Sequence, residues 1–234
     1  MRSVEVIAPT FWPEVRCGVI VEACIESLDA AMAAARGGAQ RVELCANLAA
    51  GGTSPDAAML AACVSGLAIP VFVMVRPRPG DFHYSAIEHA GMLYEIQRVK
   101  DAGAHGVVTG SLRRDGSIEE RRASELLAAA APLPVTFHRA FDECPDSAQA
   151  LETLIRLGAA RVLTSGGAAT APDGAAKIAE LVRLAAGRIG ILAGGGVNAS
   201  NVVALVRTTG VREVHLSTTD DEKVRRVVEL VRAR

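Results

Sequence analysis

The sequence has few aromatic residues, no long apolar run and no excess of charge of one sign. Aromatic residues make up 3% of the 234 residues, so the core must be built mainly from Val, Leu, Ile and Ala, which suit parallel strands buried on both faces. No run of 18 or more apolar residues occurs, which argues against a membrane span. A formal net charge of −1 argues against a nucleic-acid-binding protein, because such proteins present a strongly basic face.

The cysteine content is low, and it does not predict a disulfide framework. The number of cysteines is odd and no CxxC pair is present. The N-terminal residues also lack the clean apolar segment of a secretory signal. We therefore expect a protein of the reducing cytoplasm. The five cysteines are Cys17, Cys24, Cys45, Cys63 and Cys144.

Short apolar runs alternate with helical segments along residues 18–234, and this alternation predicts βα units. Residues 1–17 show no clear period, and we interpret them as an N-terminal extension. The expected α/β fold is a single (β/α)₈ TIM barrel, and the length lies at the lower end of the range for such barrels. The predicted strands are Gly18–Cys24, Arg41–Cys45, Val71–Arg76, Gly106–Gly110, Val135–Arg139, Arg161–Ser165, Ile189–Gly194 and Glu213–Ser217.

An internal repeat supports the closed barrel. The segments GGAQRVELC, AGAHGVVTG, LGAARVLTS and TGVREVHLS align without gaps and fall on strands two, four, six and eight. Among the odd strands, IPVFVMVR resembles LPVTFHRA. The repeating unit is therefore two βα modules, used four times. A doubly wound open sheet is the alternative, but nothing in the sequence marks edge strands or a reversal of strand order.

Local signals also predict where helices begin. Ser54 before Pro55 predicts an N-cap followed by a first-turn proline, and Asn198 predicts the cap of the helix after strand seven. The last helix is amphipathic. Its apolar face is formed by Val224, Val227, Val228 and Val231.

Ionisable residues lie at the predicted C-terminal ends of several strands, where barrel enzymes carry their chemistry. A buried Glu paired with an Arg can be purely structural, but a structural barrel does not need such groups concentrated at one end. We favour His138 for a functional role because His changes charge near neutral pH, and we interpret His215 as a core histidine. The candidate catalytic residues are Glu22, Glu43, His138, Arg76 and Arg139.

A glycine run after strand seven indicates an anion site. In many barrels, backbone N–H groups after strands seven and eight bind phosphate, and glycine lets the backbone approach the anion closely. A tight turn that merely needs glycine is the alternative. No lysine lies at a predicted strand end, which disfavours a Schiff-base mechanism. The candidate anion-binding residues are Ser165, Gly194, Gly195, Gly196 and Ser217.

Cys24 and Cys45 end adjacent predicted strands, and neighbouring strands lie about 5 Å apart. Two thiolates at that range could hold a soft ion such as Cu(I). The alternative is that both are small buried residues near the barrel mouth. Zinc is less favoured, because the sequence shows only two thiolates and no nearby His pair for a four-ligand site.

Long, ordered motifs over residues 19–219 resemble those of the CutC family. They include VEACIES, GGAQRVELCANLAAGGTSP, VFVMVRPRPGDFHYS, LPVTFHRAFDE and AGGGVNASNV. The resemblance implies a TIM barrel that acts in cytoplasmic copper homeostasis, with Cys24 and Cys45 as Cu(I) ligands. This chain departs from the family pattern in residues 1–17 and in the short segment that follows Ser217.

Two functions therefore remain open. One is a Cu(I)-binding protein of copper homeostasis, as the resemblance implies. The other is an enzyme of lyase or isomerase type that acts on a small anionic or phosphorylated metabolite, because the predicted mouth holds acids, bases and cations that copper binding does not require. We expect no organic cofactor. We also expect a homodimer, since cyclic pairs dominate among homo-oligomers.

Overall fold

The strands of the chain close into a parallel barrel. The structure, a computed structural model, describes residues 18–217 and 220–233, and the predicted extension lies outside them. Each strand pairs with the next in sequence, and the first pairs with the last, which confirms the predicted TIM barrel. The strands are β1 (Ile20–Ile25), β2 (Arg41–Leu44), β3 (Val71–Met74), β4 (Gly106–Thr109), β5 (Val135–Phe137), β6 (Arg161–Thr164), β7 (Gly190–Ala193) and β8 (Glu213–Ser217).

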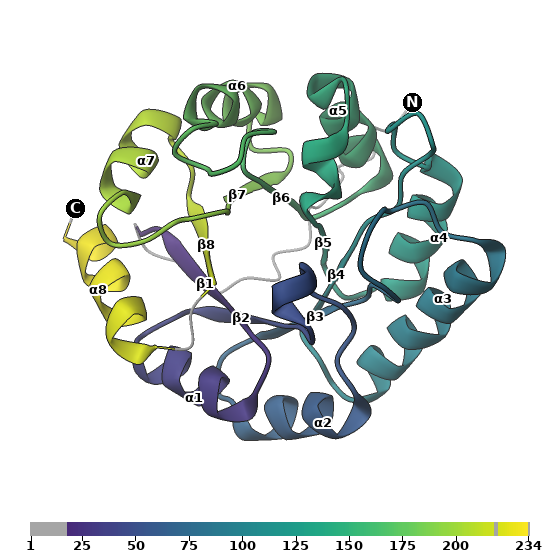
Figure 1. Cartoon of the computed structure of the whole chain (residues 1–234), viewed down its shortest axis with the longest axis horizontal. Coiled ribbons are helices and arrows are strands. Elements are labelled where there is room, and N and C mark those ends of the chain that lie inside the picture. Colours follow the sequence, from purple (N-terminus) through teal and green to yellow (C-terminus); the bar gives the residue numbers. More distant parts are fainter. Residues whose placement is uncertain (1–17, 218–219, 234) are drawn as a thin grey trace, which may run out of the picture.

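Helices form the outer layer around the strands, and α8 lies beside α1 where the ring closes (Figure 1). The four valines predicted on the last helix are all buried. At this closure a Cβ atom on Gly37 would lie 2.8 Å from the Cβ atom of Val224, so only glycine fits there. The helices are α1 (Leu28–Arg36), α2 (Ala57–Gly66), α3 (Ala86–Asp101), α4 (Glu120–Ala130), α5 (Ser147–Leu157), α6 (Ala175–Ala185), α7 (Val202–Thr209) and α8 (Asp221–Arg232).

Both predicted helix caps were wrong by a few residues. Asp56 caps α2 by accepting a hydrogen bond from a backbone N–H, while the Ser54 hydroxyl bonds to the backbone of Arg76 instead. Asn201 occupies the cap position of α7. Asn198 accepts from the backbone N–H of Ser200 and so forms the turn before the helix. In both places a side chain competes successfully for backbone groups outside the helix.

The N-terminal end of the barrel is filled by a buried charged layer around Phe72. The guanidinium groups of Arg41 and Arg161 each lie 5.0 Å from the centre of the Phe72 ring. Both arginines pair with Glu213, at 2.6 Å and 3.1 Å respectively, and Arg41 also pairs with Glu22. Buried charges persist only when they are paired in this way. This layer leaves the C-terminal ends of the strands as the place for a site.

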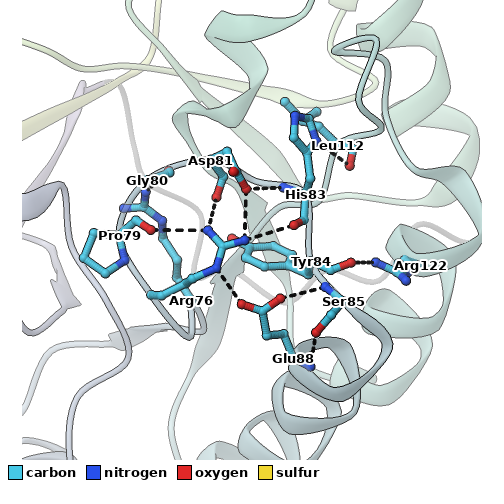
Figure 2. A network of polar contacts seen from close by, with 11 residues as sticks. Arg76, Pro79, Gly80, Asp81, His83, Tyr84, Ser85, Glu88, Leu112 and Arg122 are labelled. Carbon is cyan, nitrogen blue, oxygen red and sulfur yellow. Dashed lines mark hydrogen bonds and ion pairs between the residues drawn. The ribbon is translucent and has the colours of Figure 1, made fainter.

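Six of the predicted strands end one or two residues earlier than expected, and the difference is two residues at β3 and β5, where polar loops begin. β3 ends at Met74, so Arg76 belongs to the following loop, and β5 ends before His138. Residues 79–85 of the loop after β3 are held by Arg78, which bonds to the carboxylates of Asp81 and Glu88 and to backbone carbonyls. Figure 2 shows the network around this loop, with Asp81, His83 and Glu88 labelled. This network fixes the loop that carries Phe82. Over the described ranges, no helix has the length and apolar character needed to cross a bilayer.

Candidate functional site

A cavity of about 270 Å³ lies at the C-terminal ends of the strands. It brings together seven of the residues singled out from the sequence, which come from β1, β2, β8 and the loops after β2, β3 and β5. Those seven are Cys24, Glu43, Cys45, Arg76, His138, Arg139 and Ser217. Glu22, Ser165 and the glycine run do not line this cavity. His215 does, together with Leu48, Gly51, Met74, Phe82 and Leu163.

The two predicted thiols meet inside the barrel. The pairing of β1 with β2 places Cys24 opposite Glu43, and Cys45 follows two residues later, so all three side chains face inward. The Sγ atoms of Cys24 and Cys45 are 3.7 Å apart, and both thiols contact the Glu43 carboxyl, at 3.4 Å and 3.2 Å. Cys24 and Cys45 are 3% and 1% exposed. The three groups therefore form one compact, buried cluster.

The environment splits the pKa values of this cluster. The hydrogen bond from Cys45, helped by one from His215, lowers the pKa of Cys24 to about 6. The contact with Cys24, together with burial, raises the pKa of Cys45 well above its usual range. Burial raises the pKa of Glu43, and the negative charge on Cys24 adds to the effect. Cys24 is therefore the thiol that ionises first, and Glu43 holds its proton more tightly than an ordinary carboxyl.

His215 belongs to the site, which the sequence did not indicate. Its Nδ1 atom lies 2.8 Å from the carboxylate of Glu22 on the neighbouring strand, and its side chain also interacts with Cys24. Burial disfavours its charge, but Glu43, Cys24 and Glu22 outweigh that effect and raise the pKa of His215. Burial likewise opposes ionisation of Glu22, yet Arg41 and His215 lower its pKa to about 2. The pairing of β1 with β8 at Glu22 and His215 is the only signal for this role, and it is tertiary.

His138 does not behave as the sequence argument expected. Burial and the positive charge of Arg76 lower its pKa to about 3, so it stays neutral near physiological pH. Its Nδ1 atom accepts a hydrogen bond from the backbone N–H of Ala140 at 3.2 Å. In the neutral ring the proton is therefore on Nε2, which is buried and has no hydrogen-bond partner among the described residues. His138 can donate a hydrogen bond but cannot switch its charge near neutral pH.

The two candidate arginines differ in how far their side chains are exposed to solvent. Arg76 is buried, and its guanidinium donates to the backbone carbonyls of Gly51, Gly52 and Gly80 at 2.7 to 3.0 Å. It holds the loops that form the wall of the cavity. Arg139 has a side chain 44% exposed, and it donates from Nε and one terminal nitrogen to Asp142 and Ser165. Of the two arginines, it is therefore Arg139, paired with Asp142, that reaches solvent at the cavity rim.

The predicted anion-binding segments are tightly packed. The carboxylate of Asp142 accepts hydrogen bonds from the backbone N–H groups of Ser165 and Gly167 at 3.1 Å, so an internal anion already occupies this turn. A Cβ atom on Gly194 would lie 2.5 Å from Leu163, which explains the need for glycine there. Gly195 lies close to Arg139. Anion binding at Gly194–Gly196 and Ser217 stays a prediction.

Comparison with known proteins agrees with this barrel and with its strand-end motifs. The model of the CutC family matches residues 19–220, which is nearly the whole of the described barrel. The chain belongs to the CutC family.

Individual family members cover most of the barrel. A CutC family protein from Mesorhizobium japonicum is 46% identical over 202 residues, which are 86% of this chain and 78% of that protein. The human protein named copper homeostasis protein cutC homolog is 45% identical over 200 residues, covering 86% and 73% of the two chains. The crystal structure of CutC from Streptococcus agalactiae superposes with a TM-score of 0.81 at 34% identity, over 84% of this chain and 97% of that one.

Proposed function

We propose that this CutC-family protein binds Cu(I) through the thiolates of Cys24 and Cys45 and acts in copper homeostasis. The observation that carries the proposal is the pair of sulfur atoms 3.7 Å apart on adjacent strands, at the inner end of a cavity. Soft sulfur ligands select Cu(I) over harder cations. The name of the human relative supports the same function.

The surroundings of the thiols suit a soft monovalent ion. Cys24 and Cys45 pack in one apolar cluster with Phe72, Met74 and Val108. Burial among apolar groups keeps water away, and the positive charge of His215 favours the thiolate form of Cys24. We infer that the protein works in the cytoplasm, where thiols stay reduced, since the four described cysteines are all free.

Anaerobic Cu(I) titration against a competing chelator tests this proposal. We expect the double variant Cys24→Ser/Cys45→Ser to lose tight binding, because a hydroxyl is a poor ligand for Cu(I). Cys144→Ser is the matched control, since Cys144 does not line the cavity and its replacement should leave Cu(I) affinity unchanged. Equal affinity in the wild type and the double variant would refute the proposal.

A second candidate function is catalysis on a small anionic or phosphorylated metabolite, by lyase or isomerase chemistry. The observation that favours it is the Nε2–H of His138, which lies in the wall of the same cavity and has no hydrogen-bond partner within residues 18–217 and 220–233. Such a neutral imidazole can polarise a carbonyl or stabilise a developing oxyanion. Arg139 at the rim would attract the anionic group, and Cys24 or Glu43 would move a proton, a step worth about 10²–10⁴ in rate.

Crystals soaked separately with phosphate, sulfate and a small hydroxycarboxylic acid test the second candidate. Density for the anion facing Arg139, in the cavity lined by His138, is the expected result. An Arg139→Gln variant should lose that density, while Arg183→Gln on the outer face of α6 should keep it. A cavity that stays free of anion in all three soaks, while the thiols take up metal, would contradict an enzymatic role.

A further inference from the structure

Three potential metal ligands form a small triangle at the inner end of the cavity. The corners are the Sγ atoms of Cys24 and Cys45 and the Oε1 atom of Glu43. The sulfur atoms are 3.7 Å apart, and the oxygen lies 3.4 Å from one and 3.2 Å from the other. All three residues are at most 3% exposed. The folded chain therefore presents two soft donors and one hard donor at a single point.

The two thiols are in hydrogen-bond contact, and the spacing of their sulfur atoms fits a bent pair of metal ligands better than a linear one. Two metal–sulfur bonds of about 2.3 Å place the sulfur atoms about 3.8 Å apart at the tetrahedral angle, and about 4.6 Å apart in a linear arrangement. The observed 3.7 Å matches the tetrahedral value. A bent pair of thiolates leaves room for further ligands on the metal, and the Glu43 oxygen already lies where a third ligand would be.

The position of that oxygen also suits zinc. With a Zn–O bond of about 2.1 Å, a tetrahedral site has sulfur–oxygen distances of about 3.6 Å. The observed 3.4 Å and 3.2 Å are about 0.2–0.4 Å shorter, so a small outward shift of the Glu43 oxygen would complete the site. Carboxylate oxygen is a common zinc ligand, whereas Cu(I) is selected by soft thiolates and thioethers. We propose that Cys24, Cys45 and Glu43 are three ligands of a Zn²⁺ site whose fourth position faces the cavity. The proposal goes beyond Cu(I) binding and does not depend on it.

His215 and Glu22 lie next to the proposed ligands, as the residues that hydrogen bond to metal ligands usually do. The Nδ1 atom of His215 lies 2.8 Å from Glu22, which leaves the other side of the ring toward Cys24. Partners of this kind orient the ligands of a metal, and their loss typically lowers metal affinity about 10–100-fold. Three protein ligands with an open fourth position characterise zinc sites that bind water or substrate, and the cavity that the three ligands share is also lined by Arg139 and Ser217.

Parallel titrations with Zn²⁺ and with Cu(I), each against a competing chelator, test the proposal on the full chain. Glu43→Gln keeps the size of the side chain but removes the anionic ligand. We expect it to lower Zn²⁺ affinity by more than about 100-fold, since losing a ligand should exceed the loss of an outer partner, and to change Cu(I) affinity less than about threefold. Cys144→Ser is the control and should bind both ions as the wild type does.

X-ray absorption at the zinc edge of the wild-type complex makes the test independent of any variant. Two sulfur and two oxygen or nitrogen neighbours are expected. Wild-type affinity for Zn²⁺ in Glu43→Gln, a zinc shell without sulfur, or no Zn²⁺ binding would each overturn the zinc proposal. Zinc binding without Cu(I) binding would overturn the copper proposal alone, and Cu(I) binding without zinc would leave copper as the only cargo.

Discussion

Replacing Glu22 by Gln removes the carboxylate that joins the buried charged layer to His215, beside the cluster of Cys24, Cys45 and Glu43. Glu22 is fully buried and pairs with Arg41 and His215. In the variant both cations lose an anionic partner, although Arg41 keeps Glu213 at 2.6 Å. Breaking a buried ion pair costs about 3–5 kcal/mol. Because Arg41 keeps one partner, we expect a loss of stability near 3 kcal/mol.

The pKa of Glu22 gives a second estimate of the same size. It falls from 4.5 to about 2 on folding, and a shift of about 2.5 units corresponds to about 3 kcal/mol. A carboxyl whose pKa is lowered by folding stabilises the protein fully above its unfolded-state pKa. That stability disappears as the pH falls toward the folded-state pKa. The difference between wild type and variant should therefore be about 3 kcal/mol at pH 7 and about half of that at pH 3.

Urea unfolding of the wild type and Glu22→Gln at several pH values measures this difference. Near pH 7 the midpoint of thermal unfolding should fall by about 6–12 °C for a chain of this size. Glu180→Gln is the control, because Glu180 pairs with Lys177 on the exposed surface of α6 and should change stability by less than about 1 kcal/mol. A loss below about 1 kcal/mol, constant from pH 7 to pH 3, would refute the reasoning.

Three further outcomes are expected. Gly106→Ala would place a Cβ atom 2.0 Å from the buried Phe72 ring and should lower the free energy of unfolding by about 1–3 kcal/mol. Gly91→Ala lies on α3 with nothing close to the added Cβ atom, and it should raise the free energy of unfolding by about 0.5–1 kcal/mol. Equal urea midpoints for the two variants would contradict this. The pKa of His138 is lowered from 6.5 to about 3 on folding. The stability of the folded protein is therefore highest above pH 6.5, and it falls at lower pH because only the unfolded chain takes up a proton on this ring. The wild type should therefore lose about 2 kcal/mol relative to His138→Gln between pH 7.5 and pH 5, and a constant difference in urea unfolding would rule this out. Light scattering should give a dimer, as expected for a barrel of this size, and a monomer at working concentration would disprove it.

The architecture was readable in the sequence because its determinants are local. A strand buried on both faces must be a short apolar run, and eight such runs with a fourfold repeat leave few alternatives to a closed barrel. The thiol pair was also readable, because Cys24 and Cys45 lie at the ends of consecutive strands, and consecutive parallel strands in a barrel are neighbours. The last residues of β3 and β5 were harder to predict, because the first one or two residues of the following loops still match the pattern of a strand.

The chemistry of the site depends on contacts between distant parts of the chain. His215 was interpreted as a core residue because nothing near it in sequence shows that Glu22, 193 positions away, hydrogen bonds to its ring. His138 was expected to titrate near neutral pH, but burial and Arg76 keep it neutral. Ser165 is predicted beside the glycine run as an anion-binding residue, and only the tertiary structure shows that its backbone N–H bonds to Asp142; anion binding there stays a prediction.

The sequence by itself therefore determined the barrel, the order of its strands and the end at which polar residues gather. These follow from apolar periodicity and turn residues, which act within a few positions of one another. Only the tertiary structure decided which groups touch. It brought the Glu43 carboxylate to within 3.4 Å of both thiols and so turned a pair of cysteines into a three-donor cluster. Charge and ligand strength depend on such contacts and on exclusion of water, and neither exists until the barrel closes.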